Sequence, residues 1–175
     1  MLNASSLKSI LIDATWEKDY EHYWPDLASA ISDYITNNAE ISAMYVGAIG
    51  VVPSALNGAI HKFKASLTIS PNIIKSAAVA GVPGLNLAMS LELSKTTMSI
   101  SYTGLFTVAA PAKFISIYPV VFTPSDDYQS VVAKMANGII NALTSSIPLP
   151  PVLASPGMVV ASDGSTGVLT IVGIM

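Results

Sequence analysis

The sequence predicts an α+β fold: a helical N-terminal part, an antiparallel β middle flanked by a long amphipathic helix, and a C-terminal β-hairpin arm. Two patterns support this prediction. Apolar residues recur every three or four positions over 7–14, 27–35 and 128–143, which is typical of helices that bury one face. Over 85–102 apolar and polar residues alternate instead, which is typical of half-buried strands.

Two helices are expected in the N-terminal part. Either Ser5 or Ser6 can cap the first. The second is expected to begin at Pro25, because proline suits the first helical turn, and to end at Asn37-Asn38. Their apolar faces would be formed by Leu7, Ile10, Leu11 and Ala14, and by Leu27, Ala30, Ile31, Tyr34 and Ile35.

The next part of the chain mixes strand and helix patterns. Residues 41–53 are rich in β-branched residues and glycine, which favours a strand or a buried turn. Residues 54–67 fit either a helix or a strand, so both alternatives stay open there. Ser70-Pro71 is typical of a helix start, and Gly81 is typical of the position after a helix end.

The β middle is predicted from three runs. Leu85 to Leu93 and Met98 to Tyr102 alternate in polarity, with Lys95-Thr96 between them, so a hairpin or a meander is expected. The run from Phe114 to Phe122 is a third strand candidate, which Pro119 restricts to a sheet edge or a bulge.

The long amphipathic helix is expected from Tyr128 to Leu143, capped by Ser125-Asp126-Asp127. Gly138 lies inside this helix, where glycine costs about 1 kcal/mol relative to alanine. A glycine at such a position indicates close packing against another part of the chain.

The last part of the chain is predicted to be an extension, which divides the protein into a domain at 1–147 and a Pro-tethered hairpin at 148–175. Residues 148–156 are Pro-rich, and the apolar runs 158–161 and 168–172 flank a Gly-containing turn. An isolated hairpin is marginal in water. It would therefore fold back onto its own domain or add strands to a neighbouring subunit, and we favour the second.

Charge is scarce in this chain. Charged residues make up 11% of the sequence, against roughly 25% in an average soluble domain. Hydrophobic residues make up 51%, and the mean hydropathy is +0.57. Since interface cores are depleted of Lys, Glu and Asp, we expect a subunit with buried faces, in a homo-oligomer and beside other structural proteins. A monomer coated with Ser and Thr is the alternative.

The kind of charge excludes one class of partner. All eight basic residues are Lys, the chain has no Arg, and the net charge is -3. Nucleic-acid-binding proteins carry a basic stripe and use Arg for phosphates and base edges, so we expect no nucleic-acid contact. Seven of the eleven acids lie in residues 1–40. We therefore expect this segment to be exposed to water or to contact a basic partner.

No chemistry of an enzyme is recognisable. The chain has no Cys and only two His, His22 and His61, neither placed with further metal ligands. It has no G-x-S-x-G elbow and no glycine-rich phosphate loop. We therefore predict no catalytic residue, no cofactor and no metal site.

Membrane insertion is not expected either. The uncharged stretch 41–60 is interrupted by Pro53, and the uncharged stretch 135–162 contains four prolines.

The candidate contact residues are aromatic or β-branched. Trp and Tyr are enriched at interface hot spots, but they serve equally well as core anchors. A hairpin cannot bury its own apolar residues, so those of the C-terminal strands are also candidates for contact with a partner. The candidates are Trp16, Tyr20, Tyr23, Trp24, Val159, Val168 and Ile171.

In composition and layout the chain resembles small virion structural proteins of tailed bacteriophages, such as tail, neck and baseplate subunits. The features shared are a Cys-free, Ala/Ser/Thr/Gly/Asn-rich composition, an acidic helical start, a β-rich middle and a Pro-tethered end. The resemblance implies a structural subunit of a symmetric assembly, located in the virion or in the host cytoplasm during assembly. The alternatives are a membrane-associated or lipid-binding protein and an enzyme with dispersed catalytic residues.

Overall fold

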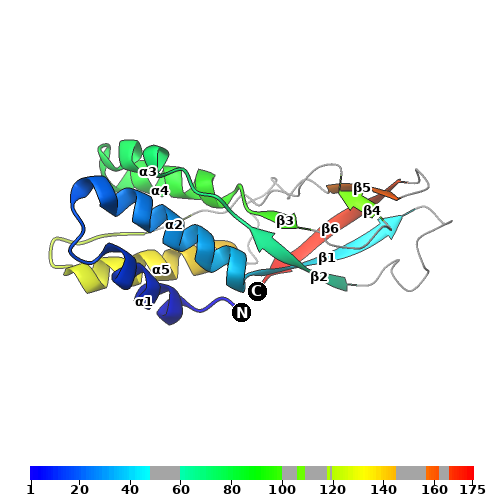
Figure 1. The fold of residues 1–175 in the computed structure, drawn as a ribbon, viewed down its shortest axis with the longest axis horizontal. Coiled ribbons are helices and arrows are strands. Elements are labelled where there is room, and N and C mark those ends of the chain that lie inside the picture. Colours follow the sequence, from blue (N-terminus) through cyan, green and yellow to red (C-terminus); the bar gives the residue numbers. More distant parts are fainter. Residues whose placement is uncertain (48–59, 100–105, 109–117, 119, 145–156, 162–165) are drawn as a thin grey trace.

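The computed structural model describes residues 1–47, 60–99, 106–108, 118, 120–144, 157–161 and 166–175. It confirms the α+β class. The helices gather at one end and the sheet extends away from them, with both chain ends where the two parts meet (Figure 1). The elements are α1 (Ala4–Thr15), α2 (Tyr20–Asn38), β1 (Glu40–Gly47), β2 (Ile60–Ser66), α3 (Pro71–Ala78), α4 (Gly81–Leu93), β3 (Thr97–Ser99), β4 (Phe106–Val108), α5 (Tyr128–Thr144), β5 (Gly157–Ala161) and β6 (Thr166–Ile174).

The described strands form one antiparallel sheet in the order β3-β2-β1-β6-β5-β4. The strand β6 pairs with β1 from Ile41 opposite Ile174 to Gly47 opposite Gly167, with a bulge at Ser42/Ala43. The predicted C-terminal hairpin is present as β5 and β6. It folds back onto β1 of its own chain, so the pairing with a neighbour that we favoured from the sequence is not the arrangement found. The predicted boundary at 147/148 lies outside the described residues.

The second helix starts earlier than the sequence predicted. Its N-cap is Asp19, whose carboxylate accepts hydrogen bonds from the backbone N–H groups of Glu21 and His22. The helix therefore begins at Tyr20, and Pro25 lies inside it, where proline removes one hydrogen bond of the ladder. The cap satisfies the first backbone donors and fixes the start, which outweighs the proline as a boundary signal.

Residues 85–93 form a helix, and the strand predicted there was wrong. In α4 the side chains of Leu85, Met89 and Leu93 are buried at helical spacing, whereas Leu87 and Leu91 are exposed. Leucine, methionine, alanine and glutamate all favour helices, and that preference outweighs the alternating polarity. Only Thr97–Ser99 of the second run is described as a strand, and among the described residues of the third run, 118 and 120–122, none lies in a strand.

The first helix is confirmed, but its cap is Asn3 and not Ser5 or Ser6. The stretch 54–67, for which a helix and a strand both stayed open, contains the strand β2. The helix α3 starts at Pro71 as expected, and Gly81 follows it with a φ of 79°. Asp127 caps α5 by accepting a hydrogen bond from the backbone N–H of Ser130.

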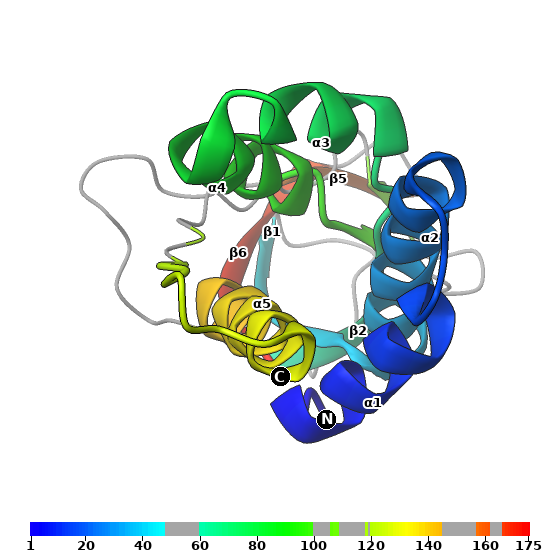
Figure 2. The ribbon, with the colours of Figure 1, turned by 90° about the vertical axis from the view of Figure 1, so that its left-hand side faces the viewer.

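The core lies among the helices and where they meet the sheet. Figure 2 shows α1 and α2 on one side, α3 and α4 on another, and α5 on a third. Their apolar faces point inward, so the helices bury one another as well as the near end of the sheet. The large side chains with no exposure include Leu7, Leu11, Leu27, Ile31, Ile35, Ile41, Ile74, Met89, Leu93, Tyr118 and Ile139.

Candidate assembly surfaces

The four aromatic residues predicted as contact candidates divide between core and surface, and Tyr20 and Tyr23 both contact Trp24, whereas Trp16 contacts Tyr128. Tyr23 and Trp24 are half-buried and pack against the core. Trp16 at the end of α1 is 51% exposed, and Tyr20 at the start of α2 is 57% exposed. Tyr23 and Trp24 are therefore core anchors, whereas Trp16 and Tyr20 remain candidates for contact with a partner.

Ring contacts hold the exposed pair in place. The Trp16 ring meets the Tyr128 ring edge-on, with centroids 5.0 Å apart, and the Tyr20 and Trp24 centroids are 6.3 Å apart. The centroids of Tyr23 and Trp24 are 5.1 Å apart. Such edge contacts add about 0.5–1.5 kcal/mol each. The exposed rings are thus fixed by the half-buried ones.

The turn between α1 and α2 carries an unusual backbone. Glu17 has a φ of 57°, the left-handed region, and it is the one non-glycine residue with positive φ among those that the structure describes. A glutamate there costs on the order of 1 kcal/mol. This conformation sets Trp16 and Tyr20 on either side of the turn.

A lysine lies against Tyr20. The Lys75 Nζ is 5.0 Å from the centroid of the Tyr20 ring and 3.0 Å from the Glu21 carboxylate. An ammonium group held by one aromatic ring and one carboxylate combines a cation–π contact with an ion pair. Tyr20 thus already binds a cation within the chain.

Behind the exposed pair, hydroxyl groups are buried among apolar side chains. Burial raises the pKa of Tyr23 to about 12 and raises the pKa of Tyr118 further, because neither phenolate can be solvated. The hydroxyls of Thr15 and Tyr128 form a short hydrogen bond. Within the described part of the chain, the Trp24 Nε1 and the Tyr118 hydroxyl have no hydrogen-bond partner although both are buried.

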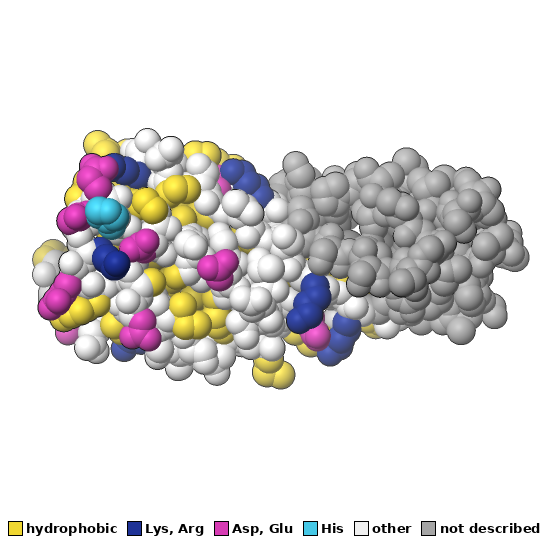
Figure 3. Space-filling view, viewed as in Figure 1, with side chains coloured by type: hydrophobic (Ala, Val, Ile, Leu, Met, Phe, Trp, Pro, Cys, Tyr) yellow, Lys and Arg dark blue, Asp and Glu magenta, His cyan; other side chains and the backbone are white. Residues whose placement is uncertain are grey.

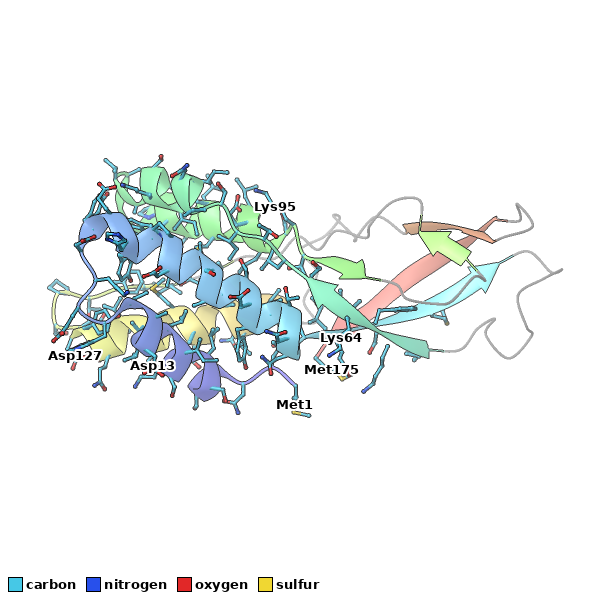
Figure 4. The ribbon with its side chains drawn as sticks, in the orientation of Figure 1. Met1, Asp13, Lys64, Lys95, Asp127 and Met175 are labelled. Atoms are coloured by element: carbon cyan, nitrogen blue, oxygen red, sulfur yellow. The ribbon has the colours of Figure 1, made fainter. Side chains whose placement is uncertain are left out.

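Acidic side chains surround this end of the molecule. Figure 3 shows carboxylates spread over the helical end, whereas other lysines lie where the sheet leaves the helices. Figure 4 shows Asp13 and Asp127 at this end. The acids carried by α1, α2, the turn between them and the start of α5 are Asp13, Glu17, Asp19, Glu21, Asp26, Asp33, Asp126 and Asp127.

A second apolar surface, on α4, was missed by the sequence reasoning. Leu87 is 64% exposed and Leu91 is 55% exposed, one turn apart on the outward face of the helix. Ala80 and Pro83 continue this face and are exposed too. The one charged residue within α4 is Glu92, which is buried and paired with Lys95. We call Ala80, Pro83, Leu87 and Leu91 the α4 face; the strand prediction had put both leucines on the buried side.

The remaining contact candidates lie in the sheet. The structure places the backbones of Val159 in β5 and of Val168 and Ile171 in β6. Val159 pairs with Gly167, Val168 with Met158, and Ile171 with Ala43. These backbones are therefore joined within one chain, and they do not join the aromatic cluster.

The titratable residues offer little chemistry in the part of the chain that is described. The ring Nδ1 of exposed His22 lies 2.7 Å from the Asp19 carboxylate, and hydrogen bonds from the backbone and ring of His22 lower the pKa of Asp19. Over the described residues, no three His, Asp or Glu side chains cluster as metal ligands would. Nor does any described helix have the length and apolarity needed to cross a membrane.

Comparisons with known proteins gave no match to a family model, a curated protein or a solved structure.

Proposed function

We propose that this chain is a non-catalytic subunit of a protein assembly, in which two copies meet through the α4 face. The observation that carries the proposal is the exposure of Leu87 and Leu91 on a helix face without charge. Burying a leucine stabilises by about 1.5–3 kcal/mol, so two half-exposed leucines on each copy give a contact a substantial driving force.

A second copy is the occupant that fits best. Most soluble oligomers are symmetric dimers or multiples of them, in which the same patch meets itself. The α4 face can do so without placing like charges opposite each other, since Glu92 points away from it. The composition agrees, because 11% charged residues leave much of the surface to be covered by another chain.

The absence of cysteine makes a direct test possible. Leu87→Cys and Leu91→Cys each introduce a single thiol on the α4 face. If two copies meet there, mild oxidation converts one or both variants to a disulfide-linked dimer faster than Asn137→Cys, a matched change at an exposed position of α5. Equal rates at all three positions would contradict the proposal.

Lipid would cover the same leucines, so it needs its own control. Flotation with phosphatidylcholine vesicles checks this alternative. The proposal expects the wild-type chain to stay in the protein fraction and the Leu87→Lys variant to behave in the same way.

The virion is the setting in which we propose to look for this assembly. The support is the resemblance in composition and layout to tail, neck and baseplate subunits of tailed bacteriophages. Detection of the chain by mass spectrometry in purified particles, at many copies per particle, is the expected result. Its absence from purified particles of a phage whose genome encodes it would contradict this setting but not the α4 contact.

A further inference from the structure

We propose that the surface around Trp16 and Tyr20 binds a cationic segment, rich in Lys or Arg, of a different protein. This surface, the acidic aromatic end, consists of Trp16, Tyr20, Asp13 and Glu17. It shares no residue with the α4 face, so it stands apart from the self-association proposed above.

The rings of Trp16 and Tyr20 are exposed and yet held in place. Each is more than half exposed, at 51% for Trp16 and 57% for Tyr20, yet each is fixed by an edge contact to a neighbouring aromatic ring. Rigid aromatic side chains lose little conformational entropy when a partner covers them, which is why they dominate binding hot spots. The rings are therefore prepared for contact.

The chain itself places a cation against this surface. The Lys75 ammonium group lies over the Tyr20 ring and pairs with Glu21 at 3.0 Å. Trp16 offers a larger ring, which binds cations better than tyrosine does. Asp13 lies one helical turn before Trp16, and Glu17 follows it. A partner's Lys or Arg would meet the same combination of ring and carboxylate.

The charge around this surface is complementary to a basic partner. The eight acids of α1, α2, the turn between them and the start of α5 share these elements with three lysines, Lys8, Lys18 and Lys134, and Lys75 of the neighbouring α3 is a fourth. The excess of four negative charges favours a basic partner and speeds its approach.

A second copy of this chain is a poor source of that positive charge. It has no Arg, and ion pairs already hold lysines throughout the part of the chain that the structure describes: Lys18 with Asp26, Lys62 with Glu40, Lys75 with Glu21, Lys95 with Glu92, and Lys134 with Asp126. The occupant is therefore a basic segment of another protein.

A hexaarginine peptide at 0.15 M salt is the probe, with hexaglutamate as its control. The chain has two tryptophans, so Trp24→Phe leaves Trp16 as the reporter, and it removes a buried N–H that lacks a partner in the described part of the chain. We expect a saturable change in Trp16 emission with hexaarginine and none with hexaglutamate. No saturable change with hexaarginine would overturn the proposal.

Paired charge variants separate a specific site from general attraction. In the Trp24→Phe variant, the further change Asp13→Asn is expected to raise the Kd for hexaarginine about fivefold or more, because the proposal places this carboxylate beside the bound cation. Asp33→Asn removes the same charge from an exposed helical position about 20 Å along α2 from Tyr20, and it should change Kd less than about twofold. Equal losses would overturn the proposal. Leu87→Lys should bind the peptide like the wild type, which distinguishes a failure here from a failure of the α4 contact.

Discussion

Gly138 allows another part of the chain to pack closely against α5. A Cβ atom at this position would lie 2.5 Å from the Val120 Cγ2 and 2.9 Å from the Tyr118 Cε2. The sequence indicated close packing, because a glycine interrupts an otherwise good amphipathic helix. It could not name the partners, since they lie about twenty residues earlier in a run that was predicted to be a strand.

Gly138→Ala is therefore expected to lower the free energy of unfolding by about 1–3 kcal/mol, although alanine is the better helix former. Urea unfolding followed by circular dichroism measures this. Asn137→Ala, at the exposed neighbouring position, should be neutral or slightly stabilising. Adding Val120→Ala to Gly138→Ala should recover part of the loss relative to the sum of the single changes, because it removes the nearest clashing atom. Strict additivity would contradict the packing described.

Among the elements, α2 was predicted correctly as a helix, whereas α4 was predicted as a strand. The stripe of α2 was found from the sequence because its apolar residues follow helical spacing without ambiguity. In α4 apolar residues occupy every second position, which predicts a strand, although Leu85, Met89 and Leu93 among them also lie one helical turn apart. The two readings differ in where Leu87 and Leu91 point, and the sequence reasoning therefore missed the α4 face.

A pair of substitutions tests the helix directly. Met89→Ala removes a fully buried side chain and should cost about 2–5 kcal/mol of unfolding free energy. Leu87→Ala changes an exposed side chain of the same helix and should stay within about 0.5 kcal/mol in the monomer, measured at low protein concentration. A strand would place both on one face, and similar losses for the two variants would contradict the helix.

The caps of α2 and α5 give the fold a defined response to acid. Hydrogen bonds from Ser130, through its side chain and its backbone N–H, lower the pKa of Asp127 below 3.8, and those from His22 lower that of Asp19. A carboxyl group whose pKa is lower in the folded state stabilises the fold above its unfolded pKa. That contribution is lost as the pH falls through the folded value.

We therefore expect the urea midpoint to fall between pH 5 and pH 3 as these caps protonate. Asp127→Asn keeps a good N-cap that cannot titrate, so it should leave the midpoint at pH 7 nearly unchanged and reduce its fall at pH 3. Asp33→Asn serves as the control, because Asp33 does not cap a helix; it should keep the acid sensitivity of the wild type. If Asp127→Asn shows the same acid sensitivity as the wild type, the cap is not the cause.

At the scale of the whole molecule, two surfaces of different chemistry lie on one helical end. The acidic aromatic end combines exposed rings with carboxylates, and the α4 face is apolar and uncharged. The sequence supplied the aromatic candidates and the charge asymmetry directly. It could not place them relative to α4, because that depends on how helices far apart in the chain pack together.

The position of the C-terminal hairpin could not be predicted from the sequence either. Its two strands were predicted from alternating apolar runs, and β5 and β6 confirm them. Whether such a hairpin pairs with its own chain or with a neighbour depends on an available edge, which is a property of the folded sheet. The edge of β1 provides it, so the hairpin is part of the sheet.

Molar mass in solution tests most directly whether the chain assembles through the α4 face. Size exclusion with light scattering should give a multiple of 18.2 kDa for the wild type that persists on dilution to micromolar concentration. The Leu87→Lys/Leu91→Lys variant should give the single-chain mass with unchanged circular dichroism. A wild-type protein that elutes as a folded monomer at every concentration would contradict the account.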